Sequence, residues 1–311
     1  MVQKGIYVEI PISCSMDELW EKTQNPQLHQ RWDLRFTNIE YLPRAGDEPQ
    51  RFLYQTRIGF GLKIDGQGES TGTKNGEGGG RTSSLKFWSN DPKSLIRTGS
   101  GYWKYLPEQN ATGANENRPC IRFLTWYDYE TRFGVFGRLL DLIFRALLGW
   151  ATAWSFDRLR QWIEEGIPPE ISRDRALIHA LARGAVAFIW FYHGLVPKLL
   201  YQNVIELDLL SKIGIAQQHI SAAVTFAGWV EVAFAILLLF LWRQRWPLWL
   251  TIVLMLIGIP AVAARAPEYL SAAFNPVSLN ISLAVAALIA LIADRNLTTA
   301  TRCARRPAPK L

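Results

Sequence analysis

The sequence predicts an α+β soluble domain followed by an all-α bundle of four transmembrane helices. Short runs of alternating apolar and polar residues fill residues 36–129, and a long helical pattern follows at residues 137–165. Four long apolar stretches then occupy most of the remaining chain. Alternation is typical of half-buried strands, and apolar stretches of about 20 residues are long enough to cross a bilayer.

Charge separates the same two parts of the chain. Residues 1–172 hold 21 Lys and Arg and 21 Asp and Glu, whereas the remaining residues hold 13 and 6, so the entire net charge of +7 lies in the second part. Its basic residues lie between and after the apolar runs, which indicates membrane topology and argues against a nucleic-acid surface. The three cysteines are far apart and form no Cys-x-x-Cys pair, so neither a disulfide framework nor a metal site is expected.

The first domain is expected to stay in the cytosol. Residues 1–10 alternate like a strand and carry no apolar signal-peptide region behind their one lysine.

Short helices are expected after this first strand. Ser15, followed by Asp17 and Glu18, is a typical helix start, and one or two short helices fit before Trp32. We then expect an antiparallel sheet of about six or seven strands and a long helix with a broad apolar face.

This order of elements resembles the helix-grip fold of the START-like, or SRPBCC, superfamily over about residues 3–165. Residues 149–159 are also similar to the terminal helix of a bacterial branch of that superfamily. The resemblance implies an apolar cavity between the sheet and the last helix, which would hold a lipid, a polyketide or another hydrophobic ligand. An aromatic stripe on a helix is more often part of an ordinary core than of a ligand-binding wall, and this is the alternative for each candidate lining residue. The candidates are Trp126, Tyr127, Trp150 and Trp154.

No catalytic residue is assigned from the sequence. His29 and Asp33 are spaced as an acid–base pair, although a lone exposed histidine at a helix end is the commoner case. The glycine-rich run at 76–81 lacks the Lys-Ser/Thr ending of a phosphate loop and is interpreted as a hairpin loop. An enzyme would need acid and base groups that point into the cavity. Candidates for that role are His29, Asp65, Glu69 and Arg122.

The four apolar stretches obey the positive-inside rule. They are residues 177–200, 220–242, 246–264 and 274–293. The third is the weakest, because Pro260 interrupts it and Arg265 closes it. With the first domain inside, nine basic residues fall on inner segments and three on outer loops. We therefore expect a multi-pass protein of the cell inner (plasma) membrane with both termini in the cytoplasm.

Three short stretches of the second part carry a further resemblance. They are residues 190–198 (Trp-Phe-Tyr-His-Gly-Leu-Val-Pro-Lys), 228–231 (Gly-Trp-Val-Glu) and 275–280 (Asn-Pro-Val-Ser-Leu-Asn). Over about residues 173–295 the chain resembles the DoxX-like family of small four-helix membrane proteins. The resemblance implies an association with quinone-linked oxidoreductase complexes, so a membrane oxidoreductase is a candidate partner. No cysteine lies within a span and no two histidines fall at matched depth, so no bound redox cofactor is expected.

Three polar residues fall within the predicted spans, namely Arg183, His193 and Glu231. Because charge in the bilayer is costly, such residues face the bundle interior or pair with one another. Counting about 1.5 Å per residue from the inner boundary brings Arg183 and Glu231 to similar depths, with His193 nearer the outer surface. We expect Arg183 and Glu231 to pair, either to fix the packing or for a transport or redox role. Lys198 and Arg265 lie at span ends and are expected to be interfacial anchors.

The expected boundaries are a START-like domain at 1–168, a linker at 169–175, a DoxX-like bundle at 176–295 and a basic cytoplasmic tail at 296–311. This organisation favours a membrane-tethered protein that binds or transfers a hydrophobic small molecule (a lipid, quinone or polyketide-like compound) at the cytoplasmic face. The alternative is an enzyme, or a subunit of a quinone-linked membrane oxidoreductase complex. A scaffold without a small ligand is a third hypothesis.

Overall fold

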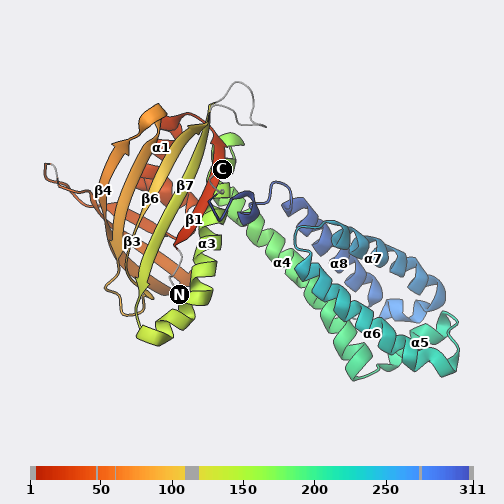
Figure 1. Ribbon diagram of the computed structural model, residues 1–311. Coiled ribbons are helices and arrows are strands. Elements are labelled where there is room, and N and C mark those ends of the chain that lie inside the picture. The colour runs from red at the N-terminus through yellow and green to blue at the C-terminus, as the bar shows by residue number, and fades with distance from the viewer. Residues whose placement is uncertain (1–4, 47, 60, 109–118, 273–274, 308–311) are drawn as a thin grey trace. The chain divides into compact units, whose positions relative to one another are not determined.

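The computed structural model describes residues 5–46, 48–59, 61–108, 119–272 and 275–307 (Figure 1). The chain divides into two compact units. The first unit takes Met1–Ser172 together with Thr298–Leu311, and the second takes Arg173–Leu297. The first unit is therefore built from two segments that are distant in the sequence.

The first unit contains a seven-stranded sheet in the order β1-β7-β6-β5-β4-β3-β2, and every neighbouring pair is antiparallel. This confirms the sheet that the alternating runs predict. The strands are β1 (Ile6–Ser13), β2 (Asn38–Tyr41), β3 (Arg51–Gly59), β4 (Leu62–Asn75), β5 (Arg81–Trp88), β6 (Ile96–Glu108) and β7 (Cys120–Thr131).

Two short helices and one long helix accompany the sheet. They are α1 (Met16–Gln24), α2 (Pro26–Trp32) and α3 (Gly134–Glu164), and a 3₁₀ turn η1 (Glu77–Gly79) joins β4 to β5. α1 begins where the sequence predicts, since the Ser15 side chain accepts a hydrogen bond from the Glu18 amide at 3.2 Å. α3 packs mainly against β1, and Phe156 of α3 stacks on Phe123 of β7 at 4.5 Å. The predicted helix-grip arrangement is confirmed.

The inner face of the sheet is the face that carries Phe123 and Tyr127. The register places Ile10 opposite Phe123 and Ile6 opposite Tyr127. Near α1, α2 and the second half of α3, this face lies in a closed core of aromatic and aliphatic side chains. Its largest fully buried members include Trp32, Tyr105, Phe123, Phe156 and Leu159.

Glycines on the inner face of β4 and β6 lie under aromatic rings from the neighbouring strands. A Cβ added at Gly66 would lie 2.1 Å from the Tyr54 ring, and one added at Gly99 would lie 2.4 Å from the Phe87 ring. Only glycine lets a ring lie this close to the backbone. Aromatic rings of β3 and β5 therefore form part of the inner surface.

The second unit is helical. Its elements are α4 (Pro169–His193), which begins in the first unit, the π-helical turn η2 (Gly194–Leu200), α5 (Val204–Lys212), α6 (Gln217–Phe240), α7 (Trp246–Arg265), η3 (Pro267–Ser271) and α8 (Pro276–Ala293). In the described parts of the chain, five helices are long and apolar enough to span a membrane, namely α3, α4 with η2, α6, α7 and α8. The last four overlap the four predicted stretches, although α6 ends at Phe240 and α8 begins at Pro276. The residues expected as a linker are helical, because α4 begins at Pro169.

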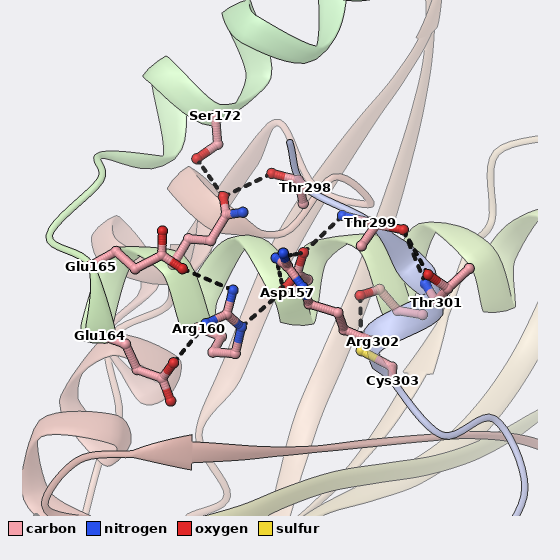
Figure 2. A network of polar contacts seen from close by, with 12 residues as sticks. Asp157, Arg160, Glu164, Glu165, Ser172, Thr298, Thr299, Thr301, Arg302 and Cys303 are labelled. Atoms are coloured by element: carbon pink, nitrogen blue, oxygen red, sulfur yellow. Dashed lines mark hydrogen bonds and ion pairs between the residues drawn. The ribbon is translucent and has the colours of Figure 1, made fainter. Parts of the chain in front are cut away.

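The segment after α8 returns to the first unit and packs on α3 (Figure 2). The Thr299 amide donates a hydrogen bond to the buried Asp157 carboxylate at 2.8 Å. A 3₁₀ turn η4 (Ala300–Arg302) follows, and Ala304 then forms an isolated antiparallel bridge with Glu9 of β1. From the sequence, residues 296–311 are expected to form a separate cytoplasmic tail. The structure differs, since the described residues from 298 onward complete the first unit.

Candidate functional site

The end of α2 places a histidine, a carboxylate and a guanidinium against the inner face. His29 Nε2 lies 3.0 Å from Asp33 Oδ2. Arg35 donates from Nη2 to Asp33 Oδ2 at 2.6 Å and from Nε to Asp33 Oδ1 at 2.9 Å. The Asp33 side chain is completely buried, and those of His29 and Arg35 are nearly so. The acid–base pair therefore forms, and the alternative of a lone exposed histidine is wrong for this chain.

Aromatic rings enclose the histidine. The His29 ring stacks on Trp32 at 5.0 Å and meets Phe36 and Trp103 edge-on at 5.3 and 4.9 Å. This packing excludes water from the imidazole and holds the plane of the ring. Because the Asp33 carboxylate accepts the hydrogen bond, Nε2 carries the proton when His29 is neutral.

The polar cluster continues to α3 through Tyr127. The Arg35 guanidinium lies 5.4 Å from the centre of the Tyr127 ring, and the Tyr127 hydroxyl shares a 2.8 Å hydrogen bond with the Thr152 hydroxyl. Ser155 of α3 accepts a hydrogen bond from the Leu34 amide at 2.8 Å. A chain of polar contacts thus joins α2, β7 and α3 across the inner face.

Burial and charge set the ionisation of this cluster. Burial lowers the pKa of His29 from its ordinary value of 6.5, and Arg35 lowers it further, against the raising effect of Asp33. Burial by itself would raise the pKa of Asp33, but the charge and hydrogen bonds of Arg35 and the bond from His29 outweigh it and hold that pKa well below its ordinary range. At neutral pH the cluster is therefore an Asp33–Arg35 ion pair that accepts a hydrogen bond from neutral His29.

This ionisation predicts how acid affects stability. Unfolded His29 takes up a proton near pH 6.5, whereas folded His29 does so only at lower pH. Just below pH 6.5 the unfolded chain binds more protons, so the free energy of unfolding falls as the pH falls. We expect His29→Gln, which keeps a donor for Asp33, to lose less stability than the wild type between about pH 7 and pH 5. Chemical unfolding of the full chain in detergent measures this. His219→Gln, at an exposed position, is the control, and equal acid sensitivity of His29→Gln and wild type would contradict the prediction.

Of the predicted lining residues in β7, only Tyr127 lies on the inner face. Successive strand residues point to opposite faces, so Trp126 points to the outer face, where its ring stacks on Tyr102 at 5.9 Å. The assignment of Trp126 as a lining residue is therefore corrected. Two adjacent residues of a regular strand cannot both line one cavity.

The two predicted lining tryptophans of α3 point away from the sheet. In this half of α3, Thr152 and Phe156 contact β7. At about 100° of rotation per residue, Trp150 and Trp154 lie on the opposite side of the helix. Their rings stack on each other at 6.4 Å. The expectation that they line a space between helix and sheet is thus also corrected.

The other candidates for an inward acid or base lie on the outer face. Asp65 accepts a hydrogen bond from the Gln55 side chain at 2.9 Å. Arg122 pairs with Glu108 at 3.1 Å. Glu69 follows the inward Gly68 by one position in β4 and so points outward. Among the four candidates named from the sequence, only His29 reaches the interior.

Beyond the polar cluster, the inner face over β3–β6 is apolar and only partly covered. Its inward side chains are partly exposed, whereas those near α1 and α2 are buried. The partly exposed set comprises Phe36, Phe52, Tyr54, Leu85 and Phe87. The two hollows described in this unit, of about 460 and 350 Å³, lie elsewhere, on the outer face of β2–β4 and beside β1 and Arg305. In the described residues the apolar inner face over β3–β6 is therefore only partly covered by the protein itself.

A second polar cluster lies in the helical unit. Lys198 Nζ lies 3.0 Å from Glu231 Oε2 and 3.5 Å from Glu206 Oε1, and its side chain is 11% exposed. Lys198 belongs to η2, a π-helical segment, and such segments are frequent at functional sites. His193 is the residue directly before η2. Lys198 is expected from the sequence to be an interfacial anchor, and in the structure its side chain instead points toward Glu231.

The predicted pairing of Arg183 with Glu231 is wrong. Arg183 donates to three backbone carbonyls in the last turn of α6 and in the turn that follows it: Leu238 at 2.8 Å, Leu241 at 2.6 Å and Gln244 at 3.1 Å. Carbonyls at the end of a helix lack partners within the helix, so the guanidinium satisfies them. Counting residues matched the depth of Arg183 to the middle of α6, whereas its contacts lie at the end of that helix.

Other polar groups of the second unit are not identified from the sequence. His179 is completely buried, its ring meets Trp242 at 5.1 Å, and its Nε2 lies 3.7 Å from Asp294 Oδ1. Position 179 lies near the start of the first predicted span. A polar residue there is easily interpreted as the boundary of the span, so His179 is not identified from the sequence. In the part of the chain that the structure describes, no three His, Cys, Asp or Glu side chains come together to hold a metal ion.

Solved structures are similar to about half of the chain. A conserved protein from Geobacillus kaustophilus is 14% identical, with 52% of this chain and 95% of that one covered and a TM-score of 0.34. The di-domain ARO/CYC BexL from the BE-7585A biosynthetic pathway is 11% identical, with 47% and 44% covered and a TM-score of 0.31. The lipid transfer and protein localization domain of human StarD13 is 13% identical, with 46% and 72% covered and a TM-score of 0.29. The fold of the first unit rests on its strand order and on the packing of α3.

The second unit matches a known family. The DoxX-like family matches residues 187–288, a range that contains the π-helical turn, Lys198 and Glu231. The uncharacterized membrane protein YndG of Bacillus subtilis (strain 168) is 50% identical over 195 residues, which is 62% of this chain and 70% of YndG. The chain therefore belongs to the family of membrane proteins that includes YndG, and its second unit contains a DoxX-like domain.

Proposed function

We propose that this membrane protein binds or transfers a hydrophobic small molecule on the inner face of its first unit. The observation that carries the proposal is the partly exposed apolar surface over β3–β6, because aromatic side chains directed inward are normally covered. A ligand that covers this surface gains affinity from the apolar area it buries. The membrane supplies such ligands, and lipids and quinones are the classes that fit.

The polar cluster at the edge of this surface supports a ligand that has one polar end. Tyr127 lies on the inner face, and Arg35 lies over its ring. Both side chains are held by partners, Arg35 by Asp33 and Tyr127 by Thr152. Groups that are fixed in this way recognise an oxygen atom with little loss of conformational entropy. The ligand would lie with its apolar part over β3–β6 and its polar end toward Tyr127.

Adjacent residues of β5 offer a matched test. Leu85 points to the inner face, and Lys86 points outward. We expect Leu85→Gln to reduce the fraction of protein that retains an apolar small molecule by roughly ten-fold, because one buried leucine contributes about 1.5 to 3 kcal/mol. Lys86→Gln should leave this fraction unchanged. Native mass spectrometry of the full chain, released from mild detergent, measures both. Absence of any retained small molecule, or equal loss in the two variants, would overturn the proposal.

The proposal includes a cytoplasmic location for the first unit. The chain leaves this unit after Ser172 and returns to it at Thr298, so the helices between them would cross the membrane an even number of times. The basic residues next to the first unit support the cytoplasmic side. In intact cells, an impermeant thiol reagent should label Gln218→Cys, in the first turn of α6, and leave Ser100→Cys in β6 unlabelled. The reverse pattern would invert the orientation.

An enzymatic role is the second candidate, and the His29–Asp33 pair is the observation that favours it. A neutral histidine that donates to a carboxylate is a common arrangement for acid–base catalysis. In this role the bound molecule would be chemically altered. Mass analysis of the molecule retained by wild type and by His29→Gln separates the two roles, since a binding protein retains the same compound in both.

A further inference from the structure

The first half of α3 presents an apolar face to its surroundings. On the side away from the sheet, Val135 is 82%, Leu142 72% and Ile143 67% exposed. We call this side the outer stripe of α3. Its members are Val135, Phe136, Leu139, Leu140, Leu142, Ile143, Leu147 and Trp150. Contiguous exposed apolar surface of this kind marks an interaction site.

The opposite side of the same helical segment is polar and packs on the sheet. The Tyr129 hydroxyl donates to Asp141 at 2.6 Å, and Arg145 pairs with Asp141 at 2.9 Å and Asp128 at 2.8 Å. A surface helix of a soluble domain has the reverse polarity, with its apolar side inward. These ion pairs fix the rotation of α3, so the outer stripe cannot turn toward the sheet.

The second half of α3 is covered on both sides, which excludes α3 as a fifth span. Thr152 and Phe156 contact β7. On another side, the Cys303 thiol donates to the Ala153 carbonyl at 3.2 Å, and Arg302 pairs with Asp157 at 3.1 Å (Figure 2). A helix that is clasped in this way cannot cross a bilayer along its length. Its exposed half can lie along a membrane surface.

Basic side chains flank the start of the outer stripe. Arg138 is exposed on the first turns of α3. Arg132, just before α3, donates a hydrogen bond to the Ser89 carbonyl at 2.6 Å. The Ser89 amide in turn donates to the Arg97 carbonyl at 3.2 Å. The exposed Arg97 therefore lies at the same end of the sheet as Arg132. An apolar stripe with basic residues beside it fits a surface of anionic lipid headgroups and acyl chains.

We infer that the outer stripe of α3 lies in the lipid–water interface of the membrane that the second unit spans. The first unit is joined to the membrane-spanning segment at both Ser172 and Thr298. This double attachment holds the stripe at a high effective concentration near lipid, so even a modest affinity is sufficient. The inference concerns a lipid surface and does not depend on the small ligand proposed above.

The full chain in lipid nanodiscs tests the inference. An environment-sensitive fluorophore is attached at Ile143→Cys in the outer stripe or, as the control, at Ser100→Cys in β6. The cysteines Cys14, Cys120 and Cys303 are buried, so the unmodified chain measures background labelling. In discs of phosphatidylcholine and phosphatidylglycerol, we expect spin-labelled lipid to reduce emission at position 143 on the order of two-fold, as for a probe at the acyl boundary. Emission at position 100 should not change.

Charge variants provide an independent arm. Leu142→Asp is expected to abolish quenching at position 143, whereas Leu62→Asp, an exposed leucine in β4, should leave it unchanged. Because both leucines are exposed, both variants should unfold in detergent like the wild type. Lipid quenching at 143 that equals quenching at 100 would overturn the inference. If the emission shift of the fluorophore at position 143 disappeared in discs that hold one protein molecule, the partner of the outer stripe would be a second copy of the chain and not lipid.

Discussion

Replacement of Asp33 by alanine is expected to lower the free energy of unfolding of the first unit by roughly 3–5 kcal/mol, because it leaves the Arg35 guanidinium buried without a counter-charge. Asp33 is completely buried and accepts hydrogen bonds from both His29 and Arg35. Hydrogen exchange of the β7 and α2 amides in the full chain measures the loss. The cluster joins α2, β7 and α3, so its loss should affect all three elements.

The matched control for Asp33 is an exposed acid. Asp174 pairs with Arg173 in solvent, and Asp174→Ala should change stability by less than about 1 kcal/mol. The double variant Asp33→Ala with Arg35→Met should recover much of the loss, because no unpaired charge is then buried. Equal effects of Asp33→Ala and Asp174→Ala, or strictly additive losses for Asp33 and Arg35, would contradict the account of this cluster.

Replacement of Arg183 by leucine is expected to destabilise the bundle by at least about 3 kcal/mol, because three carbonyls each lose a partner worth about 1 kcal/mol or more. These carbonyls lie in the last turn of α6 and in the turn after it, where the regular pattern of helical hydrogen bonds ends. Arg183→Lys should recover part of the loss, since an ammonium lacks the planar fork of donors. Unfolding of the bundle by steric trapping in bicelles gives the free energies, with Arg173→Leu at an exposed position as the control.

Double-mutant cycles separate the observed contacts of Glu231 from the pairing expected by residue counting. Glu231 accepts a hydrogen bond from Lys198. The hydrogen bonds described for Arg183 all go to backbone carbonyls. We expect Glu231→Gln and Lys198→Met to be strongly non-additive, and Glu231→Gln and Arg183→Leu to be additive. The opposite result would restore the pairing of Arg183 with Glu231.

Features that depend on a local period were predictable from the sequence. Alternation over residues 36–129 indicated the antiparallel sheet, and the apolar stretches indicated the helices of the second unit. The spacing of His29 and Asp33 indicated their pair, although not its burial. Each of these signals lies within a few residues of the chain and requires no knowledge of what packs against it.

Features that depend on a distant partner were not predictable. Periodicity shows that Trp150, Trp154 and Ile143 share one side of a helix, but not that this side faces away from the sheet. The charged residues Asp141 and Arg145 settle the direction, because their partners lie in β7. Depth counting gives the level of a residue along a helix, but it does not show whether its side chain meets another side chain or, as for Arg183, backbone carbonyls.

The return of the chain to α3 sets an order for biosynthesis. Asp157 and Thr299, which share a hydrogen bond, are 142 residues apart in the chain. At the usual rate of translation, the second residue emerges on the order of ten seconds after the first. In the proposed topology, the four long helices of the second unit would enter the bilayer during this interval, while the surface of α3 that receives Thr299 and Arg302 stays uncovered. If the last of these helices failed to insert, residue 298 would then lie on the opposite side of the membrane from α3. Insertion of the second unit would thereby be a condition for completing the first.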